Sequence, residues 1–160
     1  AGSVAVAAAA VMTLVVAGVV ALRGESLDAA ALGQAWLLHA AGLFAAAALG
    51  LALSTRLNAD AAEALTFVVL AASWLILPGV PRFLVEETGV RAVALSLLYY
   101  LFPHFELFDL RLRAVHDWGA APAGPAALIF LYAVSLAALF LAVAWLSYRK
   151  KRWKRGAQGA

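Results

Sequence analysis

The stretch PAALIFLYAVSLAALFLAVAWLSY, residues 125–148, contains no charged side chain, and RKKRWKR, residues 149–155, follows it directly. A helix of this length, at about 1.5 Å per residue, crosses the roughly 30 Å hydrocarbon core of a bilayer. Trp145, Tyr148 and Trp153 flank the junction, where interfacial aromatic residues are enriched. The stretch therefore predicts a transmembrane helix with its basic end at the cytoplasmic surface.

Three further apolar segments precede this helix, over residues 3–22, 35–53 and 61–77. The whole chain is 66% hydrophobic and 13% charged. A soluble domain has about half apolar residues and about a quarter charged residues, so too few charges are present here to cover a soluble surface. We predict an all-α fold with a single domain over residues 1–160, a polytopic transmembrane bundle of about four spanning helices.

The short connection STRLNAD, residues 54–60, predicts a tight turn between two antiparallel helices. Asp60 and Glu63 have the spacing of a capping box, which predicts a helix that begins near Ala61. In the preceding segment Gly42, Ala46 and Gly50 are spaced by four residues and predict a close-packing helix face. The alternative is that these matches only reflect the abundance of alanine.

Residues 80–123 are too polar to form one span. Pro78, Gly79 and Pro81 end the third segment. One stretch of this region, VRAVALSLLYYLF at residues 90–102, is apolar but too short to cross a bilayer, and Pro103 ends it. We predict a short interfacial or re-entrant helix over 90–102 before the last span.

The distribution of charge predicts the orientation of the chain. Half of the twelve basic residues lie in the tail 149–160, and they form an expected anchor on the cytoplasmic membrane surface, namely Arg149, Lys150, Lys151, Arg152, Lys154 and Arg155. Nucleic-acid binding is disfavoured because no other basic stripe exists. With four spans, the turn at Arg56 is cytoplasmic and residues 23–34 and 80–123 lie outside.

Motifs of enzymes are absent from the sequence. It contains no GxxxxGK[ST], HExxH, GxSxG or GxGxxG pattern and no cysteine. His39 is the one ionisable residue in the middle of a span, and we expect it to bond to a neighbouring helix rather than to carry protons. A polar group in the outer region, His104, Glu106, Asp109, His116 and Asp117, is expected to be solvated loop charge, with an enzyme site as the alternative. We predict no catalytic residue, no metal and no cofactor.

The outer region also carries a recognisable motif, LYYLFPHFELFDLRLRAVHDWG. This stretch resembles the segment between the last two membrane helices of bacterial ABC-2 type transporter permeases. The matching positions are a tyrosine-rich helix end, a proline, aromatic residues and a Phe-Asp-Leu-Arg sequence, with a histidine before a glycine turn, that is Tyr99, Tyr100, Pro103, Phe105, Phe108, Asp109, Leu110, Arg111 and His116.

The resemblance implies a function and its partners. The chain would be the permease subunit of an exporter in the bacterial inner membrane, working with a separate ABC ATPase subunit and a second permease chain. Members usually have six spans, so the four predicted here would be the third to the sixth. The element from Val90 to Phe108 would line or close the outer end of the pathway, with plain burial against the bundle as the alternative. The alternatives are a membrane scaffold without transport and, less favoured, an enzyme with an extracytoplasmic site.

Overall fold

The computed structural model describes residues 10–11, 13–15, 17–20, 22, 24, 28–110, 113 and 119–157, with side chains as far as Arg149. Much of the predicted first span, including residues 3–9, 12, 16 and 21, lies outside the described residues. Helices make up the described part, and it contains no strand. The elements are α2 (Ala29–Ser54), α3 (Ala59–Leu75), η1 (Leu77–Gly79), α4 (Val80–Glu86), α5 (Val90–Leu101), η2 (Phe105–Phe108) and α7 (Ala123–Ala157).

Helices long and apolar enough to cross a membrane occur three times in the described residues, at Ala29–Ser54, Ala59–Glu86 and Ala123–Arg149. The second of these combines α3, η1 and α4. The predicted all-α fold with membrane-spanning helices is confirmed, and the predicted count of four spans is approximately matched. The chain is therefore a membrane-embedded helical protein.

Local capping moves two helix starts from their predicted positions. α2 begins at Ala29 rather than at residue 35, because the Asp28 carboxylate accepts the N–H groups of Ala30 at 2.9 Å and Ala31 at 3.2 Å. The N-cap of α3 is Asn58, whose side-chain oxygen accepts the Ala61 N–H at 2.9 Å. The predicted cap at Asp60 is wrong, since Asp60 already lies in the first helical turn.

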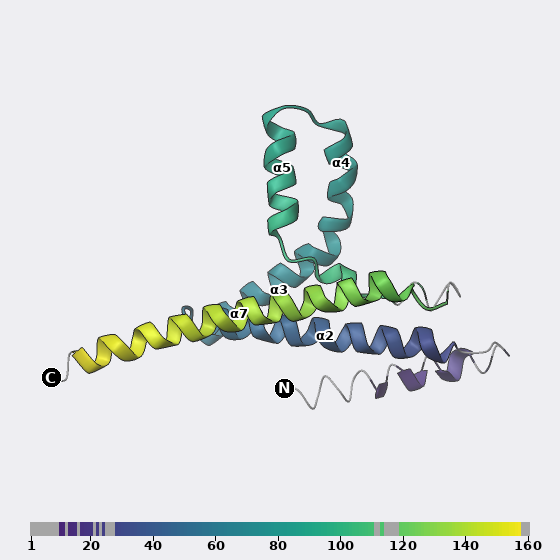
Figure 1. Cartoon of the computed structure of the whole chain (residues 1–160), viewed down its shortest axis with the longest axis horizontal. Helices are drawn as coiled ribbons and strands as arrows, with labels where there is room; N and C mark the ends of the chain where they lie inside the picture. Colours follow the sequence, from purple (N-terminus) through teal and green to yellow (C-terminus); the bar gives the residue numbers. More distant parts are fainter. Residues whose placement is uncertain are drawn as a thin grey trace.

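The outer region contains two short helices rather than one. α5 agrees closely with the predicted helix over 90–102, and α4 precedes it. Gly89, with φ of 70°, lies between them in the left-handed region that glycine adopts without strain. The two form an antiparallel hairpin that projects away from the layer of α2 and α7 (Figure 1).

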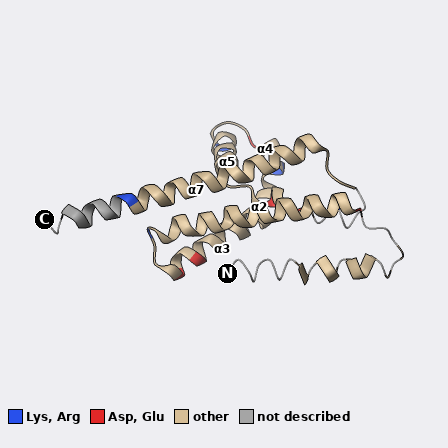
Figure 2. Ribbon diagram, turned by 60° about the horizontal axis from the view of Figure 1, so that its bottom comes forward, with Lys and Arg blue, Asp and Glu red and all other residues tan. Residues whose placement is uncertain are grey.

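α2 and α7 lie side by side and run in the same direction, whereas α3 returns in the opposite direction (Figures 1 and 2). At one end Gln34 of α2 exchanges two hydrogen bonds with the backbone of Ala121. At the other end the Arg56 Nε donates to the Ser147 hydroxyl at 3.2 Å. The turn at Arg56 and the basic end of α7 are therefore at the same end of the bundle. α7 continues through the first part of the predicted tail to Ala157.

Small side chains fill the contact between α2 and α7. Buried residues recur every seven positions on α2, at Ala31, Leu38, Ala45 and Ala52, and at spacings of seven and four on α7, at Ala126, Ala133, Ala137 and Ala144. Such spacings are typical of shallow helix crossings. Small residues let two backbones approach, which favours helix association in lipid. The predicted close-packing positions Gly42, Ala46 and Gly50 do make close contacts, but with more than one element, because Gly42 meets Phe108 of η2 whereas Gly50 meets Thr66 of α3.

Candidate functional site

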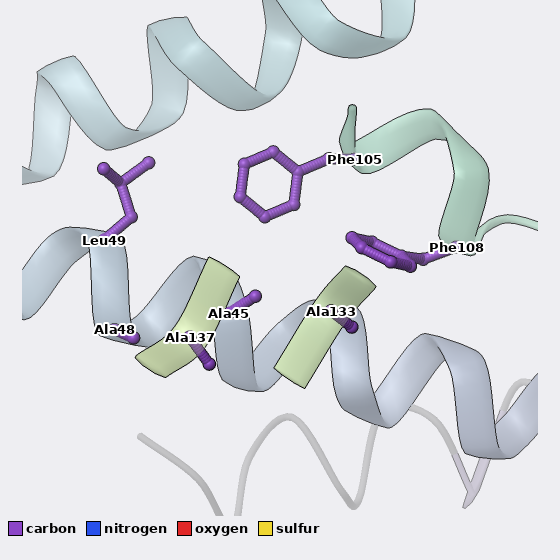
Figure 3. Close-up of a cluster of buried hydrophobic side chains, with 7 residues drawn as sticks. All are labelled: Ala45, Ala48, Leu49, Phe105, Phe108, Ala133 and Ala137. Carbon is purple, nitrogen blue, oxygen red and sulfur yellow. The ribbon is translucent and has the colours of Figure 1, made fainter. Parts of the chain in front are cut away.

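Residues 102–109, which we call the inserted turn, fold back from the α4–α5 hairpin into the bundle. Its η2 segment packs against α2, α3 and α7. Phe105 and Phe108 are each only 3% exposed. Figure 3 shows both rings lying over the small residues of the bundle, in a cluster made by Ala45, Ala48, Leu49, Phe105, Phe108, Ala133 and Ala137.

Gly42 leaves room for the ring of Phe108 directly on the backbone of α2. A Cβ added at Gly42 would lie 2.7 Å from Cδ2 and 2.9 Å from Cβ of Phe108. On its other side, Phe108 stacks on Tyr132 of α7, with ring centroids 6.0 Å apart and an interplanar angle of 27°. The position of the turn along the bundle is thus specified by a glycine on one helix and an aromatic residue on another.

Ser73 of α3 binds the start of η2. Its side chain is fully buried, and its hydroxyl accepts the N–H groups of Phe105 at 2.7 Å and Glu106 at 3.2 Å. The same hydroxyl donates to Oε2 of Glu106 at 2.5 Å. The first N–H groups of a helical turn have no partner inside the turn, so a serine from another helix caps it here.

His104 joins the inserted turn to the end of α5. Its Nε2 lies 2.9 Å from the carbonyl oxygen of Tyr99. The residue four positions after Tyr99 is Pro103, which has no N–H to continue the helix, so the imidazole takes this role. The backbone N–H of His104 donates to the Tyr132 hydroxyl at 3.0 Å, and its Nδ1 lies 2.6 Å from Oε1 of Glu106.

The connectivity of these groups differs from that of a nucleophilic triad. In a triad the imidazole contacts the serine and the carboxylate orients the imidazole. Here the carboxylate of Glu106 lies between Ser73 and His104, and the far nitrogen of the imidazole contacts a carbonyl. The oxygen of Ser73 accepts two backbone N–H groups while its hydrogen goes to Glu106, so the hydroxyl is fully engaged in holding the turn. Among the described residues no three His, Cys, Asp or Glu side chains gather to hold a metal ion.

The structure brings together most of the predicted motif. Tyr99, Pro103, Phe105 and Phe108 belong to the inserted turn or contact it through His104. Tyr100 does not, since its side chain is 78% exposed on α5. Asp109 follows η2 as its C-terminal cap residue. Three predicted positions lie outside the described residues, namely Arg111, His116 and Asp117.

The interpretation of His104 and Glu106 as solvated loop charges is wrong. Their side chains are only 13% and 19% exposed, and they contact each other and three helices. Sequence reasoning also missed Ser73 and Tyr132, which receive the turn, and it identified Gly42 only as a position for close helix packing. The sequence marks these positions only by a polar or small side chain inside an apolar span. It does not indicate which segment of the chain each of them contacts.

At the opposite end of α7, Arg149 lies over the ring of Trp145, with its guanidinium carbon 5.4 Å from the ring centroid. The side chains of the other predicted anchor residues, Lys150, Lys151, Arg152, Lys154 and Arg155, lie outside the described part. Between α2 and α7 the bundle has an open groove lined by apolar residues, among them Leu37, Phe44 and Phe130. The groove offers only apolar contacts, which suit lipid tails or another helix.

Comparisons of the chain with protein-family models, with curated proteins and with solved structures gave no match.

Proposed function

We propose that the chain is the membrane-spanning permease subunit of an ATP-driven ABC-2 type exporter in the bacterial inner membrane, with its C-terminus in the cytoplasm. A separate ABC ATPase subunit supplies the energy, and a second permease chain completes the pathway. The observation that carries the proposal is the inserted turn together with the α4–α5 hairpin. These elements lie between the last two long helices, where the motif suggests a re-entrant outer element.

The packing of the motif supports this proposal. The residues that resemble the permease motif are not scattered over a loop, because Phe105 and Phe108 are core residues of the bundle. Backbone that does not span must be covered by protein or face a wet cavity when it lies at membrane depth. The inserted turn meets this condition through Ser73, His104 and Tyr132, which bond its backbone and side chains.

The α4–α5 hairpin supports an assembly of more than one chain. It buries no residue of its own, and its large apolar side chains are exposed, including Val85 at 87%, Val90 at 86% and Leu101 at 81%. Large exposed apolar surfaces mark contacts with lipid or with partner proteins. Among the described residues, the main contact of the hairpin with the rest of the chain is the one between α4 and η1 at its base, an arrangement that suits an outer gate driven by ATPase closure.

The decisive experiment is purification of the tagged full-length protein from its native membrane in mild detergent, with partners identified by mass spectrometry. We expect a stoichiometric partner that carries a Walker A motif and hydrolyses ATP in the complex. An unrelated tagged multi-pass protein from the same membrane is the control for adventitious ATPases. Recovery of the chain without an ATPase at any salt concentration would refute the proposal.

A membrane scaffold is the second candidate. It is favoured by one observation, that every fully buried polar side-chain atom among the described residues has a hydrogen-bond partner. Such a bundle presents no spare polar group to a solute. In the same purification, a scaffold would come out alone or with membrane partners that lack a nucleotide-binding motif.

A further inference from the structure

His104 and Glu106 hold one proton between them in the inserted turn. The carbonyl oxygen of Tyr99 can only accept, so the Nε2 of His104, 2.9 Å away, carries a hydrogen. Nδ1 of His104 and Oε1 of Glu106 are 2.6 Å apart, and two such atoms form a hydrogen bond only when a proton lies between them. The pair is therefore either imidazolium with carboxylate or neutral imidazole with carboxylic acid.

The second oxygen of Glu106 cannot relieve this requirement. Oε2 is bonded to the hydroxyl of Ser73, which has accepted two backbone N–H groups and gives its only hydrogen to the carboxylate. If the shared proton left, the lone pair of Nδ1 would face an anionic oxygen at the same short distance. A largely buried carboxylate would then lose its strongest donor, which is costly in surroundings of low dielectric constant.

Within the described part of the chain, two tyrosines are the other ionisable side chains that contact the pair. From α7 the facing group is the hydroxyl of Tyr132, and from α5 it is Tyr99. The buried residues of α2 carry no ionisable group, and the buried residues of α3 are Ala62 and Ser73. On the inserted turn itself, the remaining ionisable residue is the acid Asp109.

We propose that His104 and Glu106 form a proton-binding site that locks the inserted turn into the bundle, so that loss of the proton releases the turn and the α4–α5 hairpin attached to it. The proton stabilises the inserted state by keeping the His104–Glu106 contact neutral overall. The inserted state is then favoured at low pH and lost as pH rises, because it binds a proton that the released turn gives up. This site does not depend on the proposed transport function.

Hydrogen exchange of the backbone amides reports the release directly, since the N–H groups of His104, Phe105 and Glu106 bond to Tyr132 and Ser73 in the inserted state. The experiment is exchange measured by mass spectrometry on the full-length protein in lipid nanodiscs, from about pH 6 to about pH 9, where a free imidazole loses its proton. Peptides that cover residues 102–109 are compared with peptides from α2 and α7.

Glu106→Gln is the matched comparison variant. Its amide donates permanently to a neutral His104 and accepts from Ser73, so it imitates the protonated acid and has no proton to lose. Dividing the wild-type exchange rate by the variant's rate at each pH removes the intrinsic pH dependence of exchange. We expect this ratio to rise across the range, by at most about tenfold per pH unit for one linked proton. A constant ratio would overturn the proposal.

His104→Asn provides a second and independent variant. The asparagine amide can donate to the carboxylate near the position of Nδ1 and does not titrate, so we expect the ratio of the exchange rate of His104→Asn to that of Glu106→Gln to stay constant with pH. Unchanged exchange in the α2 and α7 peptides of all three proteins shows that the bundle stays folded. Wild-type-like pH dependence in either variant would assign the release to another group and overturn the proposal.

Discussion

At the scale of single residues, three uncharged positions on the long helices place the inserted turn. Gly42 admits the ring of Phe108, Ser73 caps the turn, and Tyr132 binds it from α7. Each lies in a helix whose other residues are largely apolar and bulkier or less polar. Each also contacts a residue of the inserted turn that is far away in the sequence. Sequence analysis identified the side chains of the motif, but the positions that receive them became apparent only from their contacts.

Replacement of Gly42 by alanine is expected to destabilise the fold. The added Cβ would lie within 3 Å of three atoms of the buried Phe108, which must shift, at a cost of about 1–3 kcal/mol in the free energy of unfolding. Gly33→Ala is the matched control in α2, where nothing lies within 4 Å, and it should be neutral or stabilising by about 0.5–1 kcal/mol. Unfolding in mixed detergent micelles, followed by tryptophan fluorescence, measures both. Equal effects of the two substitutions would contradict the close contact.

Ser73→Ala removes the acceptor of two backbone N–H groups and a donor to Glu106. Because these groups are buried or partly buried, the expected loss is at least about 2 kcal/mol in the free energy of unfolding. Ser135→Ala is the control, since Ser135 is exposed and bonds only to Leu131 of its own helix, and it should cost less than about 0.5 kcal/mol. The same unfolding assay distinguishes them, and a negligible effect of Ser73→Ala would mean that water replaces the serine.

At the scale of elements, helix type and approximate extent could be predicted from the sequence, whereas ends and neighbours could not. The apolar run and Pro103 were enough to place α5 within one residue of its observed end. The early start of α2 depends on a single side chain, Asp28, which caps the helix. In the sequence alone, an aspartate at this position is equally consistent with a charge in a polar loop. The short helix α4 was missed because Pro81 was interpreted only as a helix terminator, although proline is tolerated in a first turn.

The connection before α7 is attached to α2 by one glutamine. Gln34 donates to the carbonyl of Ala121 at 3.0 Å and accepts its N–H at 2.7 Å. Gln34→Ala should cost about 1–2 kcal/mol locally and raise hydrogen exchange in residues 119–122. Gln34→Glu keeps the acceptor and loses the donor, so its exchange rates should fall between those of the wild type and the alanine variant. Unchanged exchange in the alanine variant would show that this connection is held elsewhere.

At the scale of the whole molecule, the parallel direction of α2 and α7 places positively charged residues at the same end of the bundle. Arg56, bonded to Ser147, lies at the end of the bundle where the basic run of α7 begins. The positive-inside rule predicts that this end faces the cytoplasm. The opposite end carries Gln34, Ala121 and the connection into α7.

Single cysteines test this orientation, since the chain has none of its own. In intact cells, a membrane-impermeant maleimide should label Ala120→Cys at the outer end and should leave Leu57→Cys unlabelled. After permeabilisation, both should react, because both positions are exposed. The reverse pattern of labelling would place the basic end outside.

The basic tail is expected to contribute to this orientation. Changing its six basic residues to glutamine in the Leu57→Cys background should raise the fraction labelled in intact cells, because positive charge near a span retains it on the cytoplasmic side. Ala120→Cys with the same glutamine tail serves as the comparison, because it reports the opposite end of the bundle in the same protein. A fully protected Leu57→Cys would mean that the orientation is determined upstream of the tail.

The sequence by itself determined that this protein is a helical membrane protein, because uninterrupted apolar length in a bilayer leaves the backbone no other partner than its own helix. It also determined where a short helix ends at Pro103. Only the tertiary structure decided that the segment following that proline enters the bundle. This segment mixes apolar and polar side chains, namely His104, Phe105 and Glu106. Its sequence is therefore as compatible with a solvated loop as with a buried turn. Their burial depends on a space beside Gly42 and on hydrogen-bond partners at Ser73 and Tyr132, which are brought within reach by the packing of helices distant in sequence.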